Sequence, residues 1–113
     1  MSLSLDGYVF NPILSMSDYV KNAEIEGLFG IFFLKHPEKK MADYGVVYIG
    51  ETKEIYEDNT FPAGHKKYQC WAQMGKGEDN LYIGLCPTPG LMPKQKDLIR
   101  NHLIYKYNPP CNR

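Results

Sequence analysis

The chain has 113 residues, a formal net charge of +0 and 43% hydrophobic residues. This balance excludes a disordered or fibrous chain and predicts one compact domain with a single core. It also excludes a uniformly basic surface, so any contact with nucleic acid has to come from a local patch.

Residues 1–27 are interpreted as a lead-in to the main domain. An edge strand is predicted through Tyr8–Phe10, where aromatic and β-branched residues stand together. Ser15 or Ser17 can cap a short helix that runs to Ile25, because a serine oxygen accepts hydrogen bonds from the first free amides of a helix.

Two strands are predicted next, at about residues 29–35 and 45–50, since aromatic and β-branched residues dominate both segments. The segment between them contains Pro37 and a run of charges, so it turns into water and the strands pair as an antiparallel hairpin. Gly50 ends the second strand and permits a close approach by another group, because it has no Cβ.

The second half of the chain predicts two helices and one further strand. Residues 51–59 are hydrophilic and form a weak helix at best, whereas residues 65–74 place apolar side chains at helical spacing. Leu81–Cys86 alternates and predicts a third strand. The last helix is predicted to begin near Pro93 or Lys94, because proline fits the first turn of a helix.

The three cysteines, Cys70, Cys86 and Cys111, are odd in number and widely spaced, which does not match a zinc site. The first residues lack the pattern of a secretory signal, and no stretch reaches the roughly 20 apolar residues of a membrane span. These features predict a soluble protein of a reducing compartment, with a cytoplasmic location and no membrane partner.

Three segments in order resemble the GIY-YIG nuclease superfamily: Gly30-Ile31-Phe32, Tyr48-Ile49-Gly50, and a closing Leu-Ile, Tyr, Pro, Asn pattern in residues 103–112. The resemblance extends to a bacterial subgroup with Gly-Glu-Thr after the second strand, a His-Lys segment before a cysteine, and a terminal Tyr-Asn-Pro-Pro-Cys-Asn. It covers about residues 28–113, which we take as one GIY-YIG-like domain.

The resemblance implies an α/β (α+β) fold with a small three-stranded antiparallel sheet flanked by helices. It also implies metal-dependent cleavage of DNA, with Mg²⁺ or Mn²⁺ as the metal if the activity survives. In the family, tyrosines of both motifs, an arginine, often a histidine, and a glutamate on the last helix perform this reaction.

The residues expected from the family are matched only in part. Tyr48 and Asn112 match, and His65 can stand for the histidine. Phe32 replaces the first tyrosine and has no hydroxyl.

Two further positions are exchanged in charge relative to the family, because Asp58 stands where the family has arginine and Arg100 stands where it has glutamate. A permanent cation at position 100 repels the metal that a carboxylate would hold. Asp97, one turn earlier on the same helix face, could supply a carboxylate instead. We therefore predict an altered and inactive site, with no cofactor and with an ion pair between Asp58 and Arg100.

A basic face on the last helix, with the lysines that follow His65, could contact phosphates. The alternative is an ordinary solvated charged face. An exposed Trp71 could stack on a base, although packing under the third strand is the other reading. The candidate nucleic-acid-binding residues are Lys66, Lys67, Lys96, Lys106 and Trp71.

Two functions stay open. The first is an inactive GIY-YIG-like domain that binds nucleic acid, such as DNA, or a protein partner. The second is an active metal-dependent endonuclease with a rearranged site built on Tyr48, His65 and Asp97. A carboxylate that faces Tyr48 and is not engaged by Arg100 would distinguish them.

Overall fold

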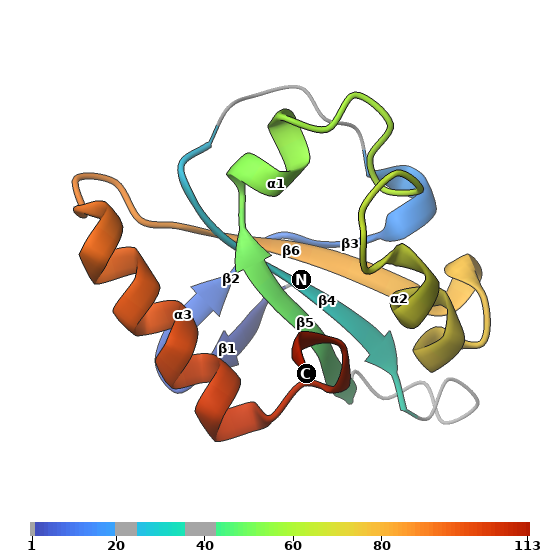
Figure 1. The fold of residues 1–113 in the computed structure, drawn as a ribbon. Helices are drawn as coiled ribbons and strands as arrows, with labels where there is room; N and C mark the ends of the chain where they lie inside the picture. Colours follow the sequence, from blue (N-terminus) through green and yellow to red (C-terminus); the bar gives the residue numbers. More distant parts are fainter. Residues whose placement is uncertain (1, 20–24, 36–42) are drawn as a thin grey trace.

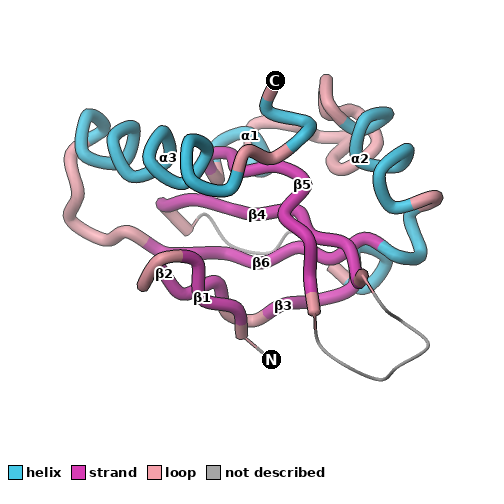
Figure 2. The backbone as a smooth tube through the Cα atoms, turned by 90° about the horizontal axis from the view of Figure 1, so that it is seen from below, coloured by secondary structure: helices cyan, strands magenta, loops and turns pink. Residues whose placement is uncertain are grey.

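The computed structural model describes residues 2–19, 25–35 and 43–113, which form an α+β domain around an antiparallel sheet (Figure 1). The described part of this sheet has four strands, in the spatial order β3, β6, β4, β5 (Figure 2). Their bounds are Ile13–Ser15 for β3, Gly27–Leu34 for β4, Tyr44–Glu51 for β5 and Leu81–Pro87 for β6. The strands β4, β5 and β6 confirm the three strands that the sequence predicted. The prediction of a three-stranded sheet is wrong, because β3 adds a fourth strand at the edge next to β6.

The central strand β4 pairs antiparallel with β5 on one side and with β6 on the other, as the predicted hairpin requires. Ile31, for example, lies between Tyr48 of β5 and Ile83 of β6. Residues 27–32 of β4 are all buried, so both faces of the sheet are covered at its centre. This burial explains why the strand is an unbroken apolar run and does not alternate with polar residues.

One face of the sheet is covered by the helices α1 (Lys53–Tyr56) and α2 (Tyr68–Gly75). On this face Phe29 of β4 packs with Ile55 of α1 and Trp71 of α2 in one buried cluster. The ring of Phe29 meets that of Trp71 edge to face at 6.3 Å, an arrangement that aromatic pairs prefer.

The opposite face is covered by α3 (Pro93–Tyr107) and by a separate hairpin near the N-terminus. Phe32 of β4 packs there with Leu103 of α3 and Phe10 of the hairpin. The hairpin consists of β1 (Leu3–Leu5) and β2 (Tyr8–Phe10), which confirms the predicted strand at β2. The residues predicted as a lead-in therefore cover the core and, through β3, extend the sheet.

The helix predicted from Ser15 or Ser17 to Ile25 lies partly outside the described residues. Its described beginning is a 3-10 turn, η1 (Met16–Asp18), and the Ser15 side chain makes no capping hydrogen bond there. The Ser15 hydroxyl instead contacts that of Ser17 at 3.0 Å. Most of the predicted turn between β4 and β5 also lies outside the described residues.

The predicted beginnings of the later helices hold at Pro93 but not at His65. The helix α2 begins at Tyr68, because the His65 ring accepts a hydrogen bond from the Lys67 amide and fixes a turn there (3.0 Å). Two further 3-10 turns are η3 (Glu78–Asn80) and η4 (Pro110–Asn112). Within the described ranges, no helix combines the length and apolar character that crossing a membrane demands.

Candidate functional site

A cleft of about 560 Å³ opens where the end of β5 meets α1 and α3. Charged side chains of both signs line it, and it is therefore not a uniformly basic groove. These side chains are Glu26, Glu51, Lys53, Glu54, Glu57, Lys66, Lys96, Asp97 and Arg100.

The carboxylate of Glu54 joins this cleft to Tyr48 and His65. Its Oε1 accepts a hydrogen bond from the Tyr48 hydroxyl at 2.8 Å and lies 2.7 Å from Nε2 of His65. Its Oε2 accepts the backbone amide of Glu51 at 2.8 Å. We call Tyr48, Glu54 and His65 the triad. Both carboxylate oxygens of Glu54 are hydrogen-bonded, one within the triad and one to the backbone.

The hydrogen bonds of His65 fix which ring nitrogen carries the proton. Nδ1 accepts the amide of Lys67, so in this geometry it holds no hydrogen, and Nε2 must donate to Glu54. The ring is buried and stacks on Trp71, with ring centres 4.5 Å apart. His65 is therefore a positioned donor whose two nitrogens are both in use.

The same contacts set the ionisation of the other two members. Burial raises the pKa of the Tyr48 hydroxyl well above its ordinary value, and the hydrogen bond to Glu54 raises it further. Burial also acts to raise the pKa of Glu54, but hydrogen bonds from His65, the Glu51 amide and Tyr48 outweigh it and lower this pKa overall. At neutral pH the pair is a phenol that donates to a carboxylate.

Glu54 was not among the site residues predicted from the sequence. The signal that could have found it is its place in the first turn of a helix, where a glutamate commonly accepts from backbone amides just before the helix. Gly50 confirms the predicted close approach, because a Cβ there would lie 2.7 Å from Oε2 of Glu54 and 2.7 Å from the Tyr48 ring. A glycine at position 50 leaves room for the triad.

The exchanged positions do not pair as predicted. Arg100 lines the cleft, and its Nη2 lies 3.8 Å from Asp97 on the same helix. Asp58 accepts hydrogen bonds from the amide and the hydroxyl of Thr60, at 2.9 Å each. The structure thus pairs Arg100 with Asp97 and not with Asp58.

The residues present do not fit the divalent metal that the resemblance implies. No group of three or more histidine, cysteine, aspartate or glutamate side chains is placed to hold an ion within the described part of the chain. Asp97, the predicted metal ligand, lies beside a permanent cation, and Glu54 already accepts from several donors.

Phe32 and Asn112 were predicted as site residues, and neither lines the cleft. Phe32 is fully buried on the other face of the sheet, against Phe10. The side-chain amide of Asn112 bonds the backbone N–H and C=O of Ile49, at 2.8 and 2.9 Å. The Asn112 side chain therefore satisfies the backbone groups of Ile49 that a further strand would otherwise bond. This role is structural.

The predicted nucleic-acid-binding residues are mostly occupied elsewhere. Trp71 is 0% exposed and packs with Leu81 and Ile83 of β6, so packing under the third strand is confirmed and stacking on a base is excluded. Lys96 lines the cleft but pairs there with Glu26 at 2.7 Å, and Lys106 pairs with Asp6 at 2.6 Å. Lys67 donates to the backbone of Arg113, and Lys66 lines the cleft.

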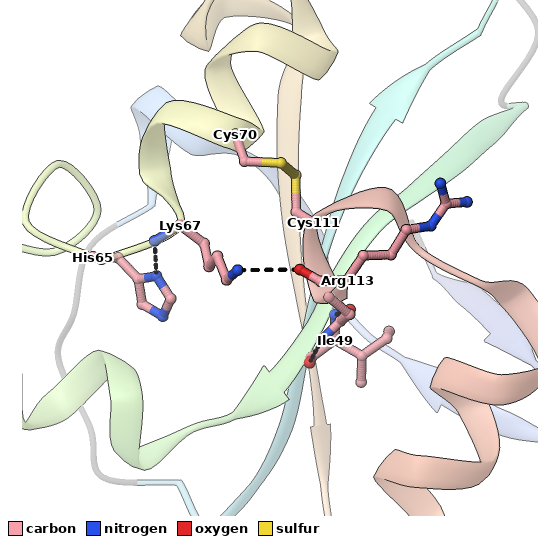
Figure 3. Close-up of a disulfide and its surroundings, with 7 residues drawn as sticks. Ile49, His65, Lys67, Cys70, Cys111 and Arg113 are labelled. Atoms are coloured by element: carbon pink, nitrogen blue, oxygen red, sulfur yellow. Dashed lines mark hydrogen bonds between the residues drawn. A yellow bond between two sulfur atoms is a disulfide. The ribbon is translucent and has the colours of Figure 1, made fainter.

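A disulfide between Cys70 of α2 and Cys111 of η4 was not foreseen (Figure 3). The two residues are 41 positions apart in the chain, but their Cα atoms are 5.8 Å apart in space. Sequence spacing does not reveal this proximity, since a disulfide depends on the distance that the fold creates. The bond bears on the predicted location, because cytosolic disulfides are usually transient or redox-sensing.

Comparisons of the chain with models of protein families, with curated proteins and with solved structures find no match. Fold and site together define a class: a small α+β domain with a charged cleft at the end of an edge strand, in which the lining residue Glu54 also bonds a buried tyrosine and histidine.

The role given to Asn112 predicts a loss of stability in Asn112→Ala. Two hydrogen bonds to the edge of β5 disappear, and the free energy of unfolding should fall by about 2 kcal/mol. Asn101→Ala, at an exposed position on α3, is the matched control. Equal urea midpoints for the two variants would contradict the role.

Proposed function

We propose that this chain is a GIY-YIG nuclease-like domain that binds nucleic acid and does not cleave it. The motif resemblance supports the class, together with the position of Tyr48 on the strand that ends at the cleft. The observation that carries the proposal is the state of Arg100. This residue lines the cleft, and its buried Nε has no hydrogen-bond partner among the described residues.

A phosphate group would complete the hydrogen bonding of Arg100. The guanidinium is planar and always charged, and its donors match two oxygens of one phosphate. Its contact with Asp97 is long, at 3.8 Å, and involves two partly exposed side chains. Such pairs contribute about 0 to 1 kcal/mol, so a phosphate can replace this one at little cost.

The cleft predicts weak contact with few phosphates. Lys66 lines the same cleft as Arg100, but five carboxylates also line it, at Glu26, Glu51, Glu54, Glu57 and Asp97. Carboxylates repel phosphates, so only the short stretch of backbone that reaches Arg100 and Lys66 is held. The proposed ligand is a nucleic-acid strand contacted at about two phosphates, which gives a shallow slope of log affinity against log salt, about −1.4 for single-stranded and about −1.8 for duplex DNA.

Cleavage is not expected, for reasons that lie in the triad and in Arg100. Tyr48 has a raised pKa and stays a phenol at neutral pH, so it cannot remove a proton from water as a tyrosinate. Both nitrogens of His65 are engaged. The carboxylate position of the family holds a cation, which cannot take over the ligand role.

Binding can be measured by fluorescence anisotropy of labelled single-stranded and duplex DNA across a salt series. Arg100→Ala should bind roughly tenfold more weakly, because a charge-assisted hydrogen bond is lost. Lys94→Ala removes an exposed charge from the same helix outside the cleft, and its affinity should stay near that of the unchanged protein. No binding by the unchanged chain, or equal loss in both variants, would refute the proposal.

An active endonuclease is the second candidate, and Glu54 is the observation that favours it. Its carboxylate faces Tyr48 at 2.8 Å, and its hydrogen bonds come from Tyr48, His65 and the Glu51 amide, not from Arg100. This is the arrangement that the sequence analysis named as the distinguishing one, although it expected the carboxylate of Asp97. Cleavage in this form would depend on Glu54.

A protein partner is favoured by the outer face of α3. Leu98 is 65% exposed and Tyr105 is 88% exposed, and residues seven apart lie on one face of a helix. An apolar pair of this kind suits a protein surface better than a phosphate chain. Unchanged DNA affinity in Leu98→Ser would separate this face from the cleft.

A further inference from the structure

The C-terminal segment, residues 108–113, is attached to two different parts of the fold. On one side the Cys70–Cys111 bond ties it to α2, and Lys67 Nζ donates to the backbone oxygen of Arg113 at a long 3.4 Å (Figure 3). On the other side Asn112 bonds the backbone of Ile49 on β5. The segment thus bridges α2 and the edge strand.

The attachment to β5 lies directly beside the triad. Ile49 follows Tyr48 in β5, and β5 is the edge strand of the described sheet, so its outer backbone groups at Ile49 are satisfied by Asn112. Cys111 precedes Asn112, so the disulfide sets the position of the amide that covers this edge. Opening the disulfide therefore weakens the hold of Asn112 on β5 at Ile49, the residue next to Tyr48.

We propose that the Cys70–Cys111 bond is a reversible redox-modification site, whose reduction releases the C-terminal segment from β5 while the sheet stays folded. This inference is independent of the ligand that the cleft takes. Asn108, in the left-handed conformation at the end of α3 with a φ of 47°, is where the released chain separates from the helix.

The reductant is a small or protein dithiol, and Cys70 is the sulfur it can reach. Cys70 is partly exposed, whereas Cys111 is 1% exposed. A thiolate of the dithiol attacks Sγ of Cys70, forms a mixed disulfide with it and expels Cys111 as a thiolate, which takes up a proton. The second thiolate then attacks the reductant sulfur, Cys70 leaves and is protonated, and the reductant ends as a disulfide after donating two electrons.

We expect reduction to release residues 108–113 without unfolding the sheet. Once the disulfide is open, this segment has fewer contacts than the central strands. Among the described contacts, only the burial of Pro109 and Cys111, the Asn112 bonds to Ile49 and the long Lys67 contact then oppose the release. The central strand β4, in contrast, is paired on both sides and buried on both faces. Units with fewer contacts open at lower free energy than the core.

Amide-resolved hydrogen exchange on the full chain tests the proposal, because the Ile49 amide is bonded only through Asn112 in the described structure. Dithiothreitol should speed exchange at Ile49 by roughly tenfold or more, as expected for opening of a local unit. Exchange at Ile31 in β4 should stay slow. The double variant Cys70→Ser/Cys111→Ser should show the fast Ile49 exchange with and without the reductant.

Two results would overturn it. If Ile49 exchange stays slow after mass spectrometry confirms two free thiols, the disulfide does not control the segment. If Ile31 and Ile49 accelerate together, the bond holds the whole fold and is not a local switch. Asn112→Ala in the oxidised protein supplies the reference rate for a β5 edge without its amide.

Discussion

Glu54→Ala should lower the free energy of unfolding by about 3 kcal/mol, because its removal leaves several donors without an acceptor. The Tyr48 hydroxyl, Nε2 of His65 and the Glu51 amide all donate to this carboxylate, and His65 is buried. The loss is expected at neutral pH, where Glu54 is ionised. Urea unfolding followed by tryptophan fluorescence measures it, since Trp71 stacks on His65.

Glu57→Ala is the matched control for this change. Glu57 follows α1, is exposed and also lines the cleft, so it tests the loss of a carboxylate without the loss of the triad. Its unfolding free energy should stay within about 0.5 kcal/mol of the unchanged protein. Similar losses in the two variants would show that the triad contributes no special stability.

Because the pKa of Glu54 is lowered, its contribution to the free energy of unfolding depends on pH. A carboxyl whose pKa is lower in the folded state than its ordinary 4.5 stabilises the fold fully above pH 4.5, and the stabilisation is lost as pH falls through the folded pKa. The stability difference between the unchanged protein and Glu54→Gln should therefore be constant above pH 4.5 and shrink as the pH falls below it. A difference that grows over this range would have the wrong sign.

Removing the disulfide should have a similar or larger effect on global stability. The Cys70–Cys111 bond closes a loop across 41 positions, and the chain-entropy model assigns a loop of this size about 4 kcal/mol of stabilisation. Unfolding of the Cys70→Ser/Cys111→Ser variant measures the loss directly. Cys86→Ser, at a buried cysteine that is free in the structure, controls for the change of a thiol to a hydroxyl. An equal loss from Cys86→Ser alone would contradict this assignment.

The sequence predicted the parts of this fold that depend on local pattern. The strands β4, β5 and β6 follow from their aromatic and β-branched runs, and the beginning of α3 follows from Pro93. It did not predict β3, because Ile13–Ser15 is too short to show a period and becomes a strand only by pairing with β6. Strands of this kind are created by tertiary contact.

The site was predicted less completely, and the reasons differ from residue to residue. Tyr48 and His65 were found through the resemblance, and the structure brings both to Glu54. Glu54 was missed because the family pattern was compared only at its own positions. Asp58 and Arg100 were expected to pair, but their places in the chain fix neither side-chain direction.

The disulfide also could not be predicted from the sequence, because its cysteines are far apart in the chain. Cys70 and Cys111 meet because α2 and η4 both contact β5 in the folded chain. Neither local composition nor spacing contains that information.

We propose that the triad and Arg100 leave a domain that binds nucleic acid and does not cleave it. The most direct measurement is incubation of the purified protein with end-labelled DNA and Mg²⁺ or Mn²⁺, followed by denaturing electrophoresis, in parallel with Glu54→Gln and Asp97→Ala. We expect full-length DNA in every reaction, while the unchanged protein still shifts the same DNA in anisotropy. Metal-dependent products made by the unchanged protein and abolished in either variant would contradict the claim and establish the rearranged nuclease.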